Sequence, residues 1–360
     1  MQRTPSCPDC DTAPLPTPRS VTRRDFVRVV GATAAAATLA QIAPLAEAAE
    51  SVKPAPETLV QKLYKSFTPA QQQKICFPWD HTDQRGLLRT RVENNWQITD
   101  VKELNVAGKF FTADQQEIIH EIFHGLYNKD WHQRIAKQLQ DDAGGYGKQQ
   151  TIALFGTPGS GKFEFVMTGR HLTIRCDGDS AANVAFGGPI FYGHAAKDFY
   201  EEPSHPGNVF WPQAQKANAV YKMLNGKQRA QALVELAPHE AAVSFRKKPA
   251  EIPGVPISEL TSDQKAHAQE VLQSLLEPYR VSDQHEALKA LKAQGGLDAC
   301  RLSFFRKGTD GDSLDLGDDG QWDVWRLEGP AFVWHFRGAP HVHVWVNVAD
   351  NPNVPLNAHG

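Results

Sequence analysis

Two histidines near the end of the chain, His341 and His343, have the spacing of a metal-binding pair. They lie in the stretch 330–347, PAFVWHFRGAPHVHVWVN, where residues alternate in two short runs joined by Gly338-Ala339-Pro340. Side chains two residues apart on a strand point to the same face, so both imidazoles can reach one ion. The pattern predicts a hairpin whose valines face the core and whose histidines face a cleft or a second layer.

Two further histidines are candidates for the same ion. His171 is predicted to lie in the middle of a strand, and His194 follows a segment rich in glycine and aromatic residues. Neutral imidazoles suit zinc, copper or iron, and the donor set alone does not separate these metals. We therefore expect a divalent transition metal at a cluster made by His171, His194, His341 and His343. The alternatives are a hydrogen-bonded histidine network in the core and acid–base catalysis without a metal.

Acidic and basic side chains are expected to complete this site. A carboxylate can fill the coordination sphere or orient an imidazole. The candidates for that role are Asp323, Glu164 and Glu202. Arg170 and Arg337 lie next to the histidine segments and can bind an anionic group on a substrate.

A second motif with metal-binding spacing is His120-Glu121-Ile122-Phe123-His124. On a helix it places two histidines one turn apart with a glutamate as general base, as in zinc proteases. The two histidines fall away from the apolar face of the predicted helix, and no third histidine follows at the expected distance. A zinc protease centred on His120 and His124 is therefore kept as an alternative.

The segment Gly156–Lys162, GTPGSGK, has the spacing of a phosphate-binding loop. Phe163 stands where such a loop has Ser or Thr, and the residues after it alternate like a strand. Without a helix there is no fan of amides to hold phosphate. We interpret this segment as a hairpin turn.

The first 48 residues have the features of a twin-arginine signal peptide. Arg23-Arg24 precede an apolar run over 29–43, and Ala46-Glu47-Ala48 offers small residues for cleavage. The run is too short to span a membrane, so we expect no stable membrane insertion after cleavage. This pattern predicts a periplasmic or extracellular protein that is exported in the folded state, which suits a cofactor inserted before export.

The remaining residues, 49–360, are predicted to form a single domain. The formal net charge is −3, and no basic run with interleaved aromatic residues indicates nucleic-acid binding. Cys76, Cys176 and Cys300 are too few and too far apart for a disulfide framework. A small-molecule substrate or ligand is the expected partner.

The predicted fold class is α+β, with an antiparallel β-sheet core and helices packed on one side. Two groups of strands, 152–194 and 302–347, are separated by a helical insertion over 214–294. Runs of strands interrupted once by helices do not have the alternation typical of a parallel sheet. No internal repeat is visible.

Several stretches together resemble a family of exported bacterial proteins known as domain of unknown function 3500. They are Phe155-Gly156-x-Pro158, Gly169-Arg170-His171-Leu172-Thr173, Gly188-Pro189-Ile190-Phe191-Tyr192-Gly193-His194, Glu328-Gly329-Pro330 and His341-Val342-His343. The resemblance extends over residues 57–350. It implies no activity, but it includes the histidine segments that the residue patterns indicate independently.

These observations favour an exported metalloenzyme in which a histidine cluster activates water or dioxygen on a small organic substrate. The alternatives are a non-catalytic ligand-binding or structural module and the zinc protease described above.

Overall fold

The computed structural model describes residues 55–195, 207–246, 248–308, 320–354 and 357–358. The predicted signal peptide and Glu202 lie outside these residues. Within the described residues, no helix is long and apolar enough to cross a membrane.

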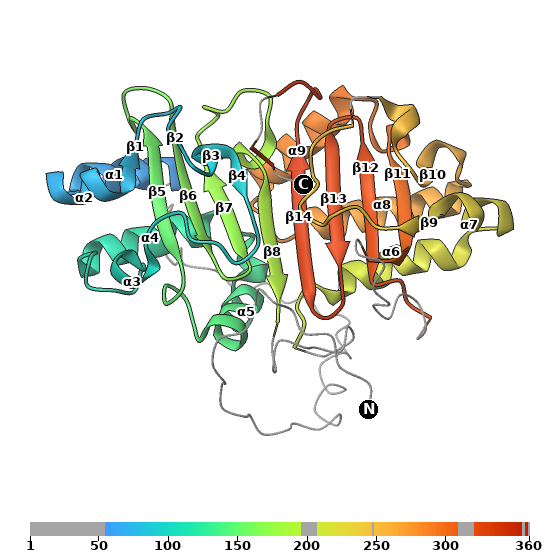
Figure 1. Ribbon diagram of the computed structural model, residues 1–360, viewed down its shortest axis with the longest axis horizontal. Coiled ribbons are helices and arrows are strands. Elements are labelled where there is room, and N and C mark those ends of the chain that lie inside the picture. The colour runs from blue at the N-terminus through green and yellow to red at the C-terminus, as the bar shows by residue number, and fades with distance from the viewer. Residues whose placement is uncertain (1–54, 196–206, 247, 309–319, 355–356, 359–360) are drawn as a thin grey trace, which may run out of the picture.

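An eleven-stranded mixed sheet forms the centre of the molecule and is seen face-on in Figure 1. Neighbouring strands are antiparallel except at two places, where β1 pairs with β5 and β9 pairs with β11 in parallel. The strands, in their order across the sheet, are β1 (Cys76–Phe77), β5 (Thr151–Gly156), β6 (Phe163–Gly169), β7 (Leu172–Cys176), β8 (Ile190–His194), β14 (Val342–Val348), β13 (Phe332–Arg337), β12 (Val324–Gly329), β11 (Arg301–Lys307) and β10 (Val255–Pro256), with β9 (Leu233–Leu236) beside β11.

Helices cover one face of this sheet and lie behind it in Figure 1. They are α1 (Pro56–Ser66), α2 (Pro69–Ile75), α3 (Val101–Leu104), α4 (Ala113–Gly125), α5 (His132–Ala143), α6 (Trp211–Met223), α7 (Gly226–Ala232), α8 (Ser262–Leu276) and α9 (Val281–Ala293). The predicted α+β class, with helices on one side and a helical insertion between two groups of strands, is confirmed.

Strand alternation assigns the side chains of β14 to two different cores. Val342, Val344 and Val346 join the large core under the helices, whereas Trp345 packs in a smaller core on the opposite face. Successive side chains of a strand point to opposite faces, so the histidines of this region lie opposite the helices. The predicted division between a valine face and a histidine face is confirmed.

Two loops cover the face opposite the helices. The first cover loop, residues 78–98, packs Leu88, Trp96 and Ile98 over β5 and β6. It also contains the short pair β2 (Thr82–Asp83) and β3 (Gly86–Leu87), and β4 (Arg91–Val92), which pairs with β15 (Asn357–Ala358). The second cover loop, residues 237–246, packs Ala241, Val243 and Phe245 in the smaller core together with side chains of β13 and β14.

The halves of the chain, residues 56–194 and 211–350, use the same order of elements. The four-strand run β5–β6–β7–β8 and the run β11–β12–β13–β14 meet at the antiparallel pair β8·β14. In each run a short strand pairs in parallel with the first strand. This short strand is β1 beside β5 and β9 beside β11. The order of strands across the sheet is therefore nearly palindromic about the β8·β14 pair.

Hydrogen bonds between helices repeat in the two halves as well. Gln71 and Gln115 exchange side-chain hydrogen bonds at 2.9 and 3.2 Å, and each also completes a capping box at the start of its own helix. Gln228 and Gln264 do the same at 3.0 Å in both directions. No repeat is visible in the sequence, and the similarity of the halves lies in the order of elements and in a few polar contacts.

The helix of the His120–His124 motif, α4, ends at Gly125, because Asn128 caps a short turn of 3₁₀-helix, Lys129–Trp131, that separates it from α5. His171 does not lie in the middle of a strand. It is in the turn between β6 and β7, in the left-handed region with φ of 48°. The segment Gly156–Lys162 does form a hairpin turn, between β5 and β6, as predicted.

Candidate metal centre

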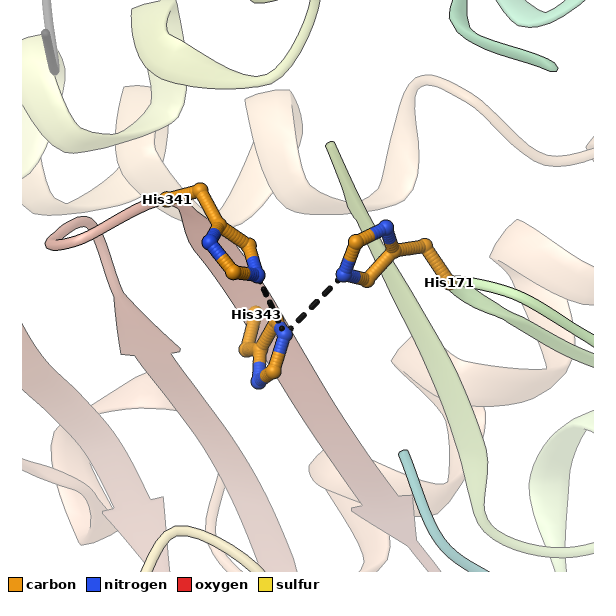
Figure 2. A group of neighbouring side chains, drawn as sticks. All are labelled: His171, His341 and His343. Atoms are coloured by element: carbon orange, nitrogen blue, oxygen red, sulfur yellow. Dashed lines mark hydrogen bonds between the residues drawn. The ribbon is translucent and has the colours of Figure 1, made fainter. Parts of the chain in front are cut away.

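Three of the four predicted histidine ligands meet at one point. The Nε2 atom of His343 lies 3.0 Å from Nε2 of His171 and 2.9 Å from Nε2 of His341 (Figure 2). The possible ligand atoms of the three residues all lie within 4.8 Å of one another. Metal–nitrogen bonds of about 2.0 Å at tetrahedral angles require nitrogens roughly 3.3 Å apart, so the observed separations suit one shared ion.

The group is assembled from both halves of the chain. His343 is on β14 and His341 directly precedes that strand, whereas His171 comes from the turn between β6 and β7. Gly193 on β8 is paired with His343, and a Cβ added at this glycine would lie 3.0 Å from Cδ2 of His171. The absence of a side chain at Gly193 therefore makes room for the His171 ring at the seam between the halves.

The outer nitrogens of two of these rings face carboxylates. Nδ1 of His171 contacts Oδ2 of Asp142, near the end of α5. Nδ1 of His343 lies 3.2 Å from both carboxylate oxygens of Glu240 in the second cover loop. Carboxylates that accept from the outer N–H of a ligating histidine fix its tautomer and orientation.

Burial determines the charge state of the group. All three histidines are buried, with at most 1% of each residue exposed. Burial lowers the pKa of His171, although the Asp142 carboxylate opposes this, and burial also lowers the pKa of His343. Burial alone would raise the pKa of Asp142, but His171 and Arg170 outweigh it and keep that pKa below its ordinary value. His171 and His343 are therefore neutral beside an ionised Asp142.

This protonation pattern leaves a lone pair at the centre of the group. The ionised Asp142 carboxylate only accepts hydrogen bonds, so the single proton of the neutral His171 ring lies on Nδ1. The Nε2 lone pair of His171 then points at Nε2 of His343, 3.0 Å away, and Nε2 of His341 lies 2.9 Å from that same atom. Imidazole nitrogens that converge in this way fit a metal ion.

The two arginines predicted to bind substrate lie behind the carboxylates. Nε of Arg170 donates to Oδ1 of Asp142 at 2.8 Å, and Nη1 of Arg337 lies 3.3 Å from Oε2 of Glu240. Arg337 is also directly opposite His343 in the β13·β14 register. Each side of the site thus has the same chain of contacts, arginine to carboxylate to histidine.

His194 is buried but is not among the converging donors. It is the last residue of β8, opposite Val342, and alternates in phase with Ile190 and Tyr192, which belong to the core under the helices. Gly193 is paired with His343 and so lies on the same face of the sheet. His194 is the next residue along β8, so strand alternation directs its side chain to the other face. The expectation of a fourth histidine ligand is corrected to a group of three.

The carboxylates that face the histidines differ from those that the sequence analysis expected. Both oxygens of Glu164 are paired, with Arg89 at 2.9 Å and Arg175 at 3.0 Å, on another part of the sheet. Asp142 and Glu240, which do face the histidines, carried no signal in the sequence beyond being acidic. The first cover loop also holds the turn that carries His171, because Oδ1 of Asn95 accepts the backbone N–H of His171 at 3.0 Å.

The His120-Glu121-x-x-His124 motif is indeed on a helix, α4, but it is not part of a three-donor group. The rings of His120 and His124 lie with centroids 4.1 Å apart, and the ring of His132 follows at 4.4 Å from that of His124. Among the described residues, the only group of at least three possible ligands within metal-binding reach is that of His171, His341 and His343. The rings of the motif and of His132 form a partly exposed row in which neighbouring rings are tilted against each other.

Comparison with known proteins identifies a family for the chain. A family model described as "Protein of unknown function (DUF3500)" matches residues 49–346. The chain therefore belongs to this family, as the sequence resemblance indicated. No match was found among curated proteins or among solved structures.

Proposed function

We propose that this family member is an exported metalloenzyme that binds one divalent transition-metal ion through His171, His341 and His343. The observation that carries the proposal is the convergence of three Nε2 atoms, at 2.9 and 3.0 Å around His343, while the outer nitrogens of two rings face carboxylates. Histidines held only for core packing have no need for this convergence of ring nitrogens.

The number of protein ligands supports a catalytic role. Structural zinc sites are closed by four protein ligands, whereas catalytic zinc sites keep three ligands and one open position. Three histidines converge here among the described residues. A metal bound in this way activates water or, for a redox metal, dioxygen. The complete burial of the histidines favours a small substrate.

The position of the carboxylates, at the outer nitrogens of the histidines, favours zinc over the other candidates. The common iron site has two histidines and one carboxylate as direct ligands, but here the carboxylates contact the outer nitrogens. Copper electron-transfer sites add a cysteine, and the described cysteines Cys76, Cys176 and Cys300 are not in the group. Three neutral imidazoles with carboxylates behind them match catalytic zinc sites best.

Export is the second part of the proposal. The twin-arginine pattern at Arg23-Arg24 lies outside the described residues, and it supports export of a chain that has already folded. A site that is buried and built from both halves forms only with the fold. Loading the metal before export is consistent with this requirement.

Metal analysis of the purified protein tests the proposal. We expect about one zinc, copper or iron ion per chain in the wild type, and strong loss of that ion in His343→Ala and His341→Ala. His120→Ala, which removes a ring of the row on α4, is the matched control and should keep the metal. A wild-type protein that takes up no stoichiometric metal contradicts the proposal. Loss of metal only in His120→Ala supports the zinc protease instead.

A further inference from the structure

The two halves place a hairpin turn at equivalent positions, and only one turn carries ionisable side chains. The turn Gly169-Arg170-His171-Leu172 joins β6 to β7 and closes with the pair Gly169·Leu172. The turn Gly329-Pro330-Ala331-Phe332 joins β12 to β13 and closes with the pair Gly329·Phe332. Arg170 and His171 therefore stand where the second half has proline and alanine.

In the second half, a neutral amide joins the last helix to this turn. Gln294 directly follows α9, and its side chain both accepts from the backbone N–H of Ala331 and donates to the backbone carbonyl of Ala331 at 3.3 Å. Its amide also donates to the carbonyl of Ala349 on the chain after β14. Neutral side chain-to-backbone hydrogen bonds thus suffice to fix a helix end against the hairpin.

In the first half, a buried carboxylate occupies the comparable place. Asp142, the penultimate residue of α5, directs Oδ1 to Nε of Arg170 at 2.8 Å and Oδ2 to Nδ1 of His171. Its side chain is fully buried, and that of Arg170 is 6% exposed. Burying charged groups costs several kcal/mol per ion before their attraction is counted, and apolar or neutral replacements are often no less stable.

We propose that Asp142 is a positioning residue for the metal centre, held in place by Arg170 where the fold itself requires only a neutral contact. This inference rests on the proposed metal site. By accepting from Nδ1–H of His171, the carboxylate keeps the lone pair on Nε2 and turns it toward His343. Arg170 in turn holds the carboxylate in this orientation through its hydrogen bond to Oδ1, and the second half shows the same position with a neutral contact in its place.

The backbone of His171 is consistent with this assignment. Its φ of 48° is in the left-handed region, which is sterically unfavourable for a residue other than glycine. The equivalent Ala331 is not among the residues with positive φ in the described chain. The first-half turn therefore carries both backbone strain and buried charge, and both contribute to the direction of one imidazole.

The experiment compares Asp142→Asn with Gln294→Ala as the matched control from the other half. Zinc affinity is measured by competition with a chromophoric chelator, the environment of the ion by visible absorption after cobalt substitution, and stability by urea unfolding of the metal-free protein. Asp142→Asn should bind zinc 10–100-fold more weakly and change the cobalt spectrum, because outer partners of ligating histidines have effects of about this size. Asp142→Glu should restore part of the affinity. Gln294→Ala should lower stability and leave both metal readouts unchanged.

Other outcomes separate this inference from the proposed function. If wild-type protein binds zinc and Asp142→Asn binds it equally well with an unchanged cobalt spectrum, Asp142 is only structural and the inference is overturned. If the wild type binds no zinc or cobalt, the metal site itself fails. Should Asp142→Asn not fold, Arg170→Gln takes its place. An altered cobalt spectrum and weaker zinc binding in that variant support the inference, and wild-type behaviour refutes it.

Discussion

His171 and His343 face each other through their Nε2 atoms, 3.0 Å apart, although they come from different halves of the chain. The contact closes the seam between β8 and β14 at a point where each ring is held from behind by a carboxylate. A metal ion bound here would connect the two halves directly. The site is therefore expected to contribute to stability as well as to chemistry.

Zinc should stabilise the folded chain by an amount that increases with the logarithm of its free concentration. The unfolded chain does not bring the three histidines together, so zinc binds almost only the native state. At a free zinc concentration 100 times Kd, the free energy of unfolding should increase by about 2.7 kcal/mol. Urea unfolding with zinc and with excess chelator measures this difference. In His343→Ala, zinc should not increase the free energy of unfolding. An undiminished increase in that variant would mean that zinc binds elsewhere.

Replacing Gly193 by alanine should disrupt both packing and the site. The new Cβ would lie 2.2 Å from the carbonyl oxygen of Val342 and 3.0 Å from Cδ2 of His171. Backbone cannot move aside cheaply in a central sheet, so we expect a loss of about 1–3 kcal/mol or more, with weaker zinc binding. Gly161→Ala is the control, since nothing lies within 4 Å of a Cβ at that position. Equal stability and zinc affinity in the two variants would contradict this packing argument.

Glu164→Gln should reduce stability without removing the metal. Glu164 is fully buried and pairs with Arg89 and Arg175, and burial raises the pKa of its carboxyl despite both arginines. Removing its charge leaves the buried Arg175 uncompensated, which typically costs 3–5 kcal/mol. Urea unfolding tests the loss of stability, and metal analysis of the same preparation tests whether the ion is retained. Metal loss in a folded Glu164→Gln protein would mean that this carboxylate serves the site after all.

Glu286→Gln should stabilise the protein at alkaline pH and have little effect in acid. Burial raises the pKa of Glu286 to about 7, and the neighbouring Asp177 and Asp283 add to it, while the N–H of Phe186 opposes the shift. Because the native state holds this proton more tightly than the unfolded chain, stability falls as pH rises from about 4.5 to 7. Glutamine keeps an acceptor for the N–H and carries no charge.

The gain for Glu286→Gln at pH 8 should be about 1 kcal/mol, after allowance for solvent around the partly exposed side chain. Urea unfolding at pH 5 and pH 8 measures it, with Glu270→Gln on α8 as an exposed control. A gain of the same size at both pH values would show that the carboxylate charge is not its cause.

Local patterns in the sequence predicted the elements that carry two of the three histidines. Alternation over 332–348 indicated the β13–β14 hairpin, and the side-chain period of two put His341 and His343 on the face opposite the valines. These signals are local because neighbouring residues along a strand or helix share one geometry.

Contacts between distant segments were decided only by the tertiary structure. The turn that contains His171 is only two residues long and interrupts a run with the alternation of a strand, so the sequence pattern placed His171 within a strand. The partners Asp142 and Glu240 come from a helix end and a cover loop, where no periodic pattern relates them to a histidine. The similarity of the halves also escaped detection, since they share the order of elements but few residue types.

The sequence by itself therefore determined which face of each strand its side chains occupy, because that depends on backbone geometry a few residues long. It did not determine which imidazoles meet, because that depends on how β8 and β14 align the two halves across the sheet. Only the folded chain brings His171 to His343, leaves His194 on the other face, and places a buried carboxylate behind each of the two facing rings.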